Sequence, residues 1–281
     1  MLKEIAKEIS PPFLYAILKK KFRRDERPYN PAWHTIQGGI LKGRELFLDP
    51  KDGLWQKEML EGKYDSYIFD YLRPLNLEGK TIFDIGSHIG YHAMHFASLV
   101  GDKGCVCAFE PNRFNRERMD IILKRSPELA RRIRIFDVAI SDGDGEEEFH
   151  FARDVDKGTS SGSFIDKAHT FYPKSKEYLE SFETITTKTV SLDRLSPLLD
   201  RDVIPDVIKI DVEGAESSVL QGAIGMLKKQ RPLIVMEVHS IYNMFRTSEI
   251  LRSTHYKMVL LKEEIDGRCF IAGEPLAEVL P

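Results

Sequence analysis

The segment from Thr81 to Met94 places the strongest constraint on the fold of this chain. It begins with the apolar run TIFDI, continues through GSHIG, and ends in residues that favour a helix. A short apolar run followed by a turn is typical of a buried strand, and Gly86 and Gly90 remove side chains where the backbone can approach a ligand. The segment therefore predicts a strand, a ligand-binding turn and a helix.

The glycine spacing in this turn argues against two common nucleotide-binding motifs. Gly86 and Gly90 are spaced as G-x-x-x-G, so the G-x-G-x-x-G pattern of dinucleotide-binding folds is absent. The Lys-Ser or Lys-Thr ending of a phosphate-binding loop is absent as well. These differences argue against an oxidoreductase that uses NAD and against an ATP-binding protein.

A second apolar segment, from Cys105 to Phe109, ends at a carboxylate. Glu110 follows Gly90 by about 20 residues, the distance at which an acid commonly accepts hydrogen bonds from ribose hydroxyls in α/β folds. Glu110 could instead cap a helix over residues 113–124. We favour the ribose role because the acid follows the glycine turn at this spacing.

Further apolar segments that end in polar residues follow, and together they form an ordered set of motifs. The set is DIGSHIG (84–90), FEPN (109–112), VAISD (138–142), SLD (191–193), IDVEGAE (210–216) and EVH (237–239). In these motifs the chain resembles the FkbM family of S-adenosylmethionine-dependent methyltransferases from residue 81 to residue 239. One such string would be weak evidence, whereas six in order make the resemblance specific.

The resemblance implies a class I methyltransferase fold and its cofactor. This α/β fold has a Rossmann-like sheet of seven mostly parallel strands with helices on both faces, in this chain preceded by an N-terminal helical and hairpin extension. We expect the carboxylate end of S-adenosylmethionine near the glycine turn, its ribose at Glu110, and its adenine beside residues 137–139. The predicted cofactor-binding set is Asp84, Gly86, His88 (through its backbone), Gly90, Glu110, Pro111, Asn112, Asp137, Val138, Ala139 and Asp211.

Methyl transfer to a hydroxyl requires an aligned nucleophile and a general base. Asp211 follows the fourth predicted strand, and Glu237 and His239 end the fifth, so we expect all three at the substrate mouth as catalytic residues. The same three side chains could hold a divalent cation such as Mn²⁺, but their spacing is not diagnostic, and we predict no metal. Glu213 is a candidate for substrate binding, whereas Glu216 is expected to be structural.

Residues 158–163, a Gly- and Ser-rich stretch, are predicted to form a loop over the cofactor. Ser160 and Ser161 are candidates for substrate binding there, although a surface excursion would explain the composition equally well. Ahead of the glycine turn, we expect a hairpin near residues 38–43, a turn at 49–53 and a helical stretch over 55–72. From this stretch Tyr64 and Asp65 could reach the amino-acid end of the cofactor.

The N-terminus differs from the rest of the chain. Residues 1–30 are predicted to form an amphipathic basic segment, residues 31–79 a cap, and residues 80–281 the methyltransferase domain. Because basic residues gather at 19–24, residues 1–24 could contact an anionic membrane surface; the alternative is a helix packed on protein. The absence of an 18-residue apolar stretch predicts a cytoplasmic protein, with peripheral contact at the inner membrane surface as a further possibility.

The charge of the chain and the family resemblance limit the classes of acceptor molecule that we expect. The chain has 41 Lys and Arg against 44 Asp and Glu, so no overall basic field suggests nucleic acid as a partner. We expect an O-methyltransferase that acts on a small-molecule or glycan acceptor. The acceptor we favour is a hydroxyl of a sugar, glycan or lipid-linked glycan precursor. A polyketide or other natural product is the alternative, followed by a non-catalytic scaffold that binds S-adenosylmethionine.

Overall fold

The computed structural model describes residues 30–51, 53–152, 162–166, 168, 182–195, 199, 203–265 and 267–277. The expected basic segment, apart from its last residue, and the candidates Ser160 and Ser161 lie outside these residues. Membrane contact through residues 1–24 and substrate binding by the two serines therefore stay predictions. None of the helices in the described ranges is long and apolar enough to cross a lipid bilayer.

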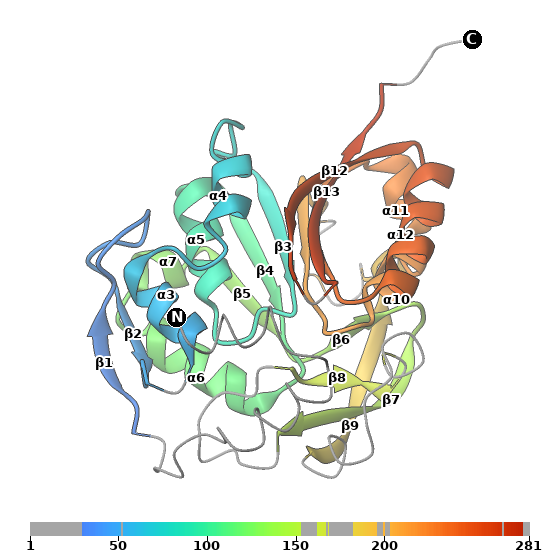
Figure 1. The fold of residues 1–281 in the computed structure, drawn as a ribbon. Helices are drawn as coiled ribbons and strands as arrows, with labels where there is room; N and C mark the ends of the chain where they lie inside the picture. Colours follow the sequence, from blue (N-terminus) through green and yellow to red (C-terminus); the bar gives the residue numbers. More distant parts are fainter. Residues whose placement is uncertain are drawn as a thin grey trace.

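A seven-stranded sheet forms the centre of the fold (Figure 1), in the order β12-β13-β11-β10-β3-β4-β5. Its parallel strands are β3 (Thr81–Ile85), β4 (Cys105–Phe109), β5 (Ile133–Phe136), β10 (Val207–Ile210) and β11 (Leu233–Val238). The last two strands, β12 (Tyr256–Glu263) and β13 (Cys269–Pro275), pair antiparallel with each other, and β13 pairs antiparallel with β11. The predicted α/β fold with seven mostly parallel strands is confirmed.

Helices cover both faces of this sheet because alternate strand residues point in opposite directions. Ile82 of β3 packs in one hydrophobic cluster with α4 (Ser66–Leu72), α5 (Tyr91–Val100) and α6 (Arg113–Leu123), and α7 (Pro127–Ala130) adds Leu129. Its neighbour Phe83 packs in the other cluster, with α10 (Glu216–Gln221), α11 (Ile224–Lys229) and α12 (Ile241–Ser253). The β strands are therefore buried from both sides, which explains their nearly continuous apolar sequences.

The cap before the glycine turn contains a hairpin and two helices. The hairpin pairs β1 (Ala32–Thr35) with β2 (Glu45–Leu48) as expected. The predicted single helical stretch over 55–72 is instead divided into α3 (Leu54–Glu61) and α4. Gly62 ends α3 with a φ of 70°, and its Cα lies so near the backbone of Gly38 that a Cβ would overlap it. Tertiary contact with the hairpin therefore fixes the break.

A second, four-stranded sheet is inserted between β5 and β10, and the sequence did not predict it as a sheet. Its order is β6-β9-β7-β8, formed by β6 (Ala139–Ser141), β7 (Gly145–Ala152), β8 (Phe164–Ile165) and β9 (Phe182–Ser191), and the short 3-10 helix η2 (Leu192–Arg194) follows β9. Phe149 and Phe151 point to one face of this sheet together with Ile165, whereas Glu148 and His150 point to the other, where the ring of His150 stacks on that of Phe164 at 5.0 Å. The predicted strand at residues 184–190 is the central part of β9.

Candidate active site

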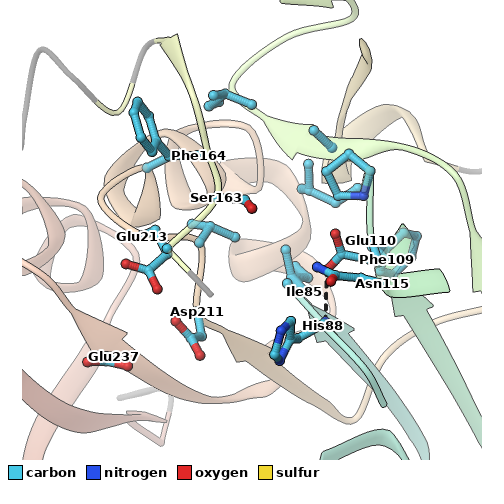
Figure 2. A pocket seen from close by; sticks show the side chains of 18 of the residues that line it. Ile85, His88, Phe109, Glu110, Asn115, Ser163, Phe164, Asp211, Glu213 and Glu237 are labelled. Atoms are coloured by element: carbon cyan, nitrogen blue, oxygen red, sulfur yellow. Dashed lines mark hydrogen bonds between the residues drawn. The ribbon is translucent and has the colours of Figure 1, made fainter. Parts of the chain in front are cut away.

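A cavity of about 700 Å³ opens where the central strands end (Figure 2). Ile85 of β3, Phe109 of β4 and Asp211 after β10 lie in its wall. The second sheet closes another side with Phe149, Phe164 and the neighbouring Ser163. The cavity therefore lies at the carboxyl ends of the parallel strands, where ligands bind in open α/β sheets.

Gly86 lets the turn after β3 pass directly beside the end of β10. Its φ is 75°, and a Cβ would overlap the main-chain oxygen of Asp211, so only glycine fits without a shift. Gly90 has a φ of 85° and precedes α5, where a Cβ would lie 2.6 Å from Cγ of Met119. Gly86 lies in the cavity wall, whereas Gly90 serves the packing of α5 against α6.

Glu110 presents a buried carboxylate to the cavity, and Pro111 lies beside it in the wall. One carboxylate oxygen accepts the backbone N–H of His88 and the other that of Asn112, both at 2.8 Å. Burial raises the pKa of Glu110 to about 7, although these hydrogen bonds oppose the shift. The cap of α6 is supplied by Asn112, whose side chain accepts the N–H of Phe114 at 3.0 Å.

Apolar residues continue the wall beside Glu110. Val138, Ala139 and Ile140 line the cavity, as does Phe109. Asp137, which was expected next to the adenine, is directed elsewhere: its carboxylate lies 2.6 Å from Arg116 and its side chain is 67% exposed. This part of the cavity thus combines an apolar surface with one buried acid, which suits a nucleoside.

A buried lysine joins the glycine turn to the end of β10. Nζ of Lys209 donates to the main-chain oxygen of Gly86 at 2.9 Å and lies 3.2 Å from Oδ1 of Asp84. It also lies 3.7 Å from Oδ2 of Asp211. Asp84 is fully buried and does not line the cavity, so it acts behind the turn by holding Lys209. Sequence reasoning missed Lys209 because it stands in the apolar strand VIKI.

Carboxylates and an imidazole gather at the ends of β10 and β11. Nε2 of His239 lies 3.4 Å from Glu213, 3.6 Å from Glu237 and 4.0 Å from Asp211. The three carboxylate residues line the cavity, whereas His239 lies behind them. Figure 2 shows Asp211 between Glu237 and Glu213 on one side and His88 on the other. The side chains at the ends of β10 and β11 therefore lie together as expected, and His239 lies behind the residues that line the cavity.

Glu216 fixes the orientation and charge of His239. Nδ1 of the imidazole lies 2.8 Å from the fully buried Glu216, which also accepts hydrogen bonds from Gly214 and Asn243. Burial alone would lower the pKa of His239, but the carboxylates of Glu216 and Glu213 raise it to about 10. The imidazole is consequently protonated at neutral pH. The sequence analysis expected a structural residue here, and the structure shows its buried carboxylate against His239.

The neighbouring acids respond differently to this environment. Burial acts to raise the pKa of Asp211, but the charges of Lys209 and His239 hold it below its usual range. Burial and the charge of Asp211 raise the pKa of Glu237 to about 8, although Arg268 lies 2.6 Å away. Asp211 is thus held in its ionised form at neutral pH.

The same cluster contains the candidate cation ligands. Asp211, Glu237 and His239 offer ligand atoms within 4.8 Å of one another, a set that could hold a metal ion. The protonated imidazole and the guanidinium of Arg268 already place two cations among these carboxylates.

The cap contributes the remaining wall of the cavity. Trp55 and Glu58 of α3 line it together with Tyr64 and Asp65, the two residues expected to reach the cofactor. Asp65 has a φ of 50°, and its carboxylate accepts the hydroxyl of Tyr67 at 2.7 Å. The ring of His88 lies 5.6 Å from that of Trp55, and burial lowers the His88 pKa to about 4. Its side chain is therefore neutral.

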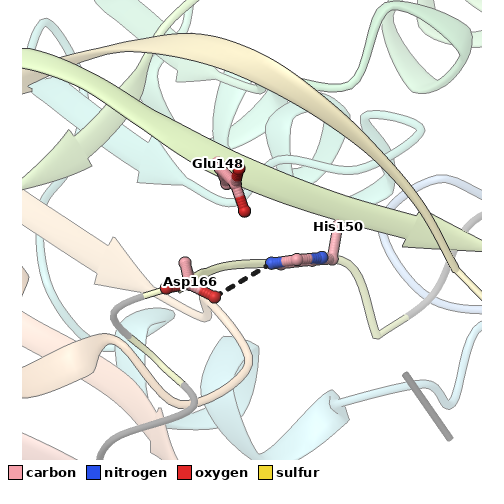
Figure 3. A group of neighbouring side chains, drawn as sticks. All are labelled: Glu148, His150 and Asp166. Atoms are coloured by element: carbon pink, nitrogen blue, oxygen red, sulfur yellow. Dashed lines mark hydrogen bonds and ion pairs between the residues drawn. The ribbon is translucent and has the colours of Figure 1, made fainter. Parts of the chain in front are cut away.

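A second group of possible ligands lies on the second sheet, on the face opposite to Phe149 (Figure 3). Nε2 of His150 is 3.2 Å from Asp166, and Nδ1 is 3.0 Å from the hydroxyl of Thr184 on β9. Glu148 completes the group. Both imidazole nitrogens already have partners in the protein, and none of the three residues of this group lines the cavity.

Comparison with known proteins gives a consistent result. Residues 84–261 match the family model described as the methyltransferase FkbM domain. The hexuronic acid methyltransferase AglP of Haloferax volcanii is 26% identical over 189 residues, which cover 66% of this chain and 66% of AglP. The chain thus matches about two thirds of the length of this curated relative.

Solved structures also resemble the chain. The methyltransferase FkbM from Methylobacillus flagellatus KT has a TM-score of 0.47 and 17% identity, over 69% of this chain and 43% of that one. A SAM-dependent O-methyltransferase from Thermotoga maritima has a TM-score of 0.47 and 14% identity, over 94% of this chain and 83% of that one.

Proposed function

This chain belongs to the methyltransferase FkbM family, and we propose that it transfers the methyl group of S-adenosylmethionine to a hydroxyl of a sugar or glycan. The observation that carries this proposal is the position of Asp211. Its ionised carboxylate lies between a nucleoside-like half of the cavity, at Glu110 and Val138, and a polar half beyond Glu213. An acid at this junction can reach both reactants.

The residues present fit the cofactor. Glu110 offers hydrogen-bond acceptors to ribose hydroxyls, and the apolar wall at 138–140 suits an adenine. Asp65 and Tyr64 line the cavity beside the start of α5, and a carboxylate there suits the ammonium group of a methionine moiety. When bound, the cofactor supplies a methyl group on a sulfonium sulfur. The sulfur part of the cofactor is already a good leaving group.

Asp211 is the proposed general base. An alcohol needs a proton acceptor as it attacks, and such a group must be unprotonated at the working pH. Asp211 meets this requirement, whereas protonated His239 cannot accept a proton. His239 instead holds Asp211 and Glu213 by its charge, and Glu216 fixes its ring. The chain's own residues thus divide the task into proton acceptance and positioning.

The polar half of the cavity supports a sugar as the acceptor. Glu58, Glu213, Lys262, Glu264 and Arg268 line the cavity and offer both donors and acceptors to a polyhydroxyl compound. Trp55 adds an aromatic surface on the same side as Glu58. The name of the relative AglP refers to a hexuronic acid, which adds support for a sugar acceptor.

A comparison of two aspartates tests the proposal. Asp211→Asn should lower the rate of S-adenosylhomocysteine formation with a sugar acceptor about 10²- to 10⁴-fold. Its affinity for S-adenosylhomocysteine, measured by calorimetry, should stay close to that of the wild type. Asp206→Asn is the control, because Asp206 precedes the same strand at its other end and pairs with Lys80. Wild-type turnover by a folded Asp211→Asn variant would refute the role of Asp211 as the base.

Metal removal separates the base from a cation mechanism. The proposed base predicts that activity survives EDTA and dialysis. If EDTA abolished activity and Mn²⁺ restored it, a cation held by Asp211, Glu237 and His239 would take the place of Asp211 as the group that activates the hydroxyl.

A further inference from the structure

Three potential metal ligands gather on the second sheet, and none of them lines the cavity (Figure 3). Glu148 and His150 alternate along β7, so both side chains point to the same face. Asp166 follows β8 directly. Because His150 pairs with Phe164 across the two strands, residue 166 comes level with Glu148. The imidazole and the two carboxylates place their ligand atoms within 4.8 Å of one another.

The two carboxylates lack a cation that would offset their charge. Among the described residues, Glu148 forms no ion pair, and Asp166 pairs only with His150. Like charges beside each other on neighbouring strands destabilise a sheet. A dication between the two acids would remove this repulsion, whereas a neutral imidazole cannot. The arrangement therefore favours a bound cation.

The distance from His150 to Asp166 suits two ligands of one metal ion better than a charge-assisted hydrogen bond. Nε2 of His150 lies 3.2 Å from Oδ1 of Asp166. Charge-assisted N–H···O hydrogen bonds are usually about 2.7–2.9 Å long. Two ligand atoms on a tetrahedral Zn²⁺, with bonds of about 2.0–2.1 Å, lie about 3.3 Å apart. Glu148 is exposed, so its side chain can turn to complete the site.

Two neighbours fix the ring of His150. Thr184 lies opposite His150 on β9, and its hydroxyl is 3.0 Å from Nδ1. The hydroxyl can accept the Nδ1 proton, which leaves Nε2 with a lone pair directed at the acids. Metal-binding histidines commonly donate their other N–H to such a partner. The ring also stacks on Phe164 at 5.0 Å, so its direction is set before an ion binds.

We propose that Glu148, His150 and Asp166 bind a transition-metal dication, with Zn²⁺ as the ion that fits best. An imidazole ligand favours such an ion over Ca²⁺ or Mg²⁺, and three protein ligands leave one tetrahedral position for water. None of the three residues lines the cavity, whereas Ile165 of β8 does. The ion takes no part in methyl transfer and fastens β8 to β7 beside the cavity wall.

Titration calorimetry of the metal-free chain with ZnCl₂ tests the site. The wild type should bind Zn²⁺, and His150→Gln and Asp166→Asn should each weaken binding at least about tenfold, because loss of an outer partner alone costs about 10- to 100-fold. Thr184→Val keeps the side-chain shape and all three ligands, and it should weaken binding by that outer-partner factor. Zn²⁺ should also raise the thermal midpoint of the wild type but not that of His150→Gln.

Two controls separate this site from other zinc-binding groups. His34→Gln removes an imidazole from β1 and should bind Zn²⁺ as the wild type does. Asp211→Asn alters the acids in the cavity and should also keep wild-type affinity. The proposal is refuted if the wild type binds no Zn²⁺, if folded His150→Gln and Asp166→Asn bind it with wild-type affinity, or if Asp211→Asn abolishes binding. Glu148→Gln, with the same loss expected, replaces either variant that does not fold.

Discussion

Replacement of Lys209 by methionine should strongly destabilise the fold. Lys209 is 2% exposed and lies 3.2 Å from the fully buried carboxylate of Asp84. Methionine has a similar length but no charge, so Asp84 would lose this cationic partner and Gly86 would lose a hydrogen bond. Removal of one member of a buried ion pair costs about 3–5 kcal/mol. The free energy of unfolding should therefore fall by that amount.

Urea unfolding followed by circular dichroism measures the effect. With a slope of about 3 kcal/mol/M, the midpoint should fall by about 1 to 1.7 M without a change in slope. Lys80→Met is the control, because Lys80 pairs with Asp206 at the exposed end of the same strands and should cost about 1 kcal/mol or less. The double variant Asp84→Asn, Lys209→Met should recover part of the loss, since residue 84 then carries no charge that lacks its cationic partner.

Two results would refute this reasoning. One is an equal loss of stability for Lys209→Met and Lys80→Met, which would mean that burial of the pair has no energetic consequence. The other is a double variant no more stable than Lys209→Met alone, which would show that the carboxylate of Asp84 is not the source of the cost.

Three further predictions concern the cofactor site and the N-terminus. Because the pKa of Glu110 is raised to about 7 and a carboxylate is the better acceptor, calorimetric affinity for S-adenosylhomocysteine should fall as the pH drops from about 8 to 6. This trend should be absent in Glu110→Gln; a pH-independent wild type would contradict it. Gly86→Ala should lower the urea midpoint more than Gly79→Ala. Gly79 has the same φ of 75°, but a Cβ there would lie 3.8 Å from its nearest neighbour, Cβ of Lys103. Equal midpoints for the two variants would argue against the close approach of Gly86 to Asp211. Deletion of residues 1–24 should leave cofactor affinity unchanged but abolish flotation with anionic liposomes, and equal recovery of both proteins would favour packing on protein.

The sequence by itself determined the elements whose signals are local. Apolar runs marked the parallel strands, and Gly86 marked the turn after β3. The acids at the ends of β10 and β11 could also be expected to meet, because neighbouring parallel strands bring their carboxyl ends to one edge. Glu110 and Asp211 were therefore placed near the cavity from their positions along the chain.

Only the tertiary structure decided the features that depend on distant partners. The sequence does not show why Lys209 stands in an apolar strand, because its partner Asp84 is distant along the chain. Nor does the sequence show that the side-chain oxygen of Asn115 is buried without a partner among the described residues. His239 was expected to act as a base, but the carboxylate of Glu216 keeps it protonated. Hydrogen bonds and charges act through space over a few ångströms, so the protonation of a side chain follows from the neighbours that folding brings to it.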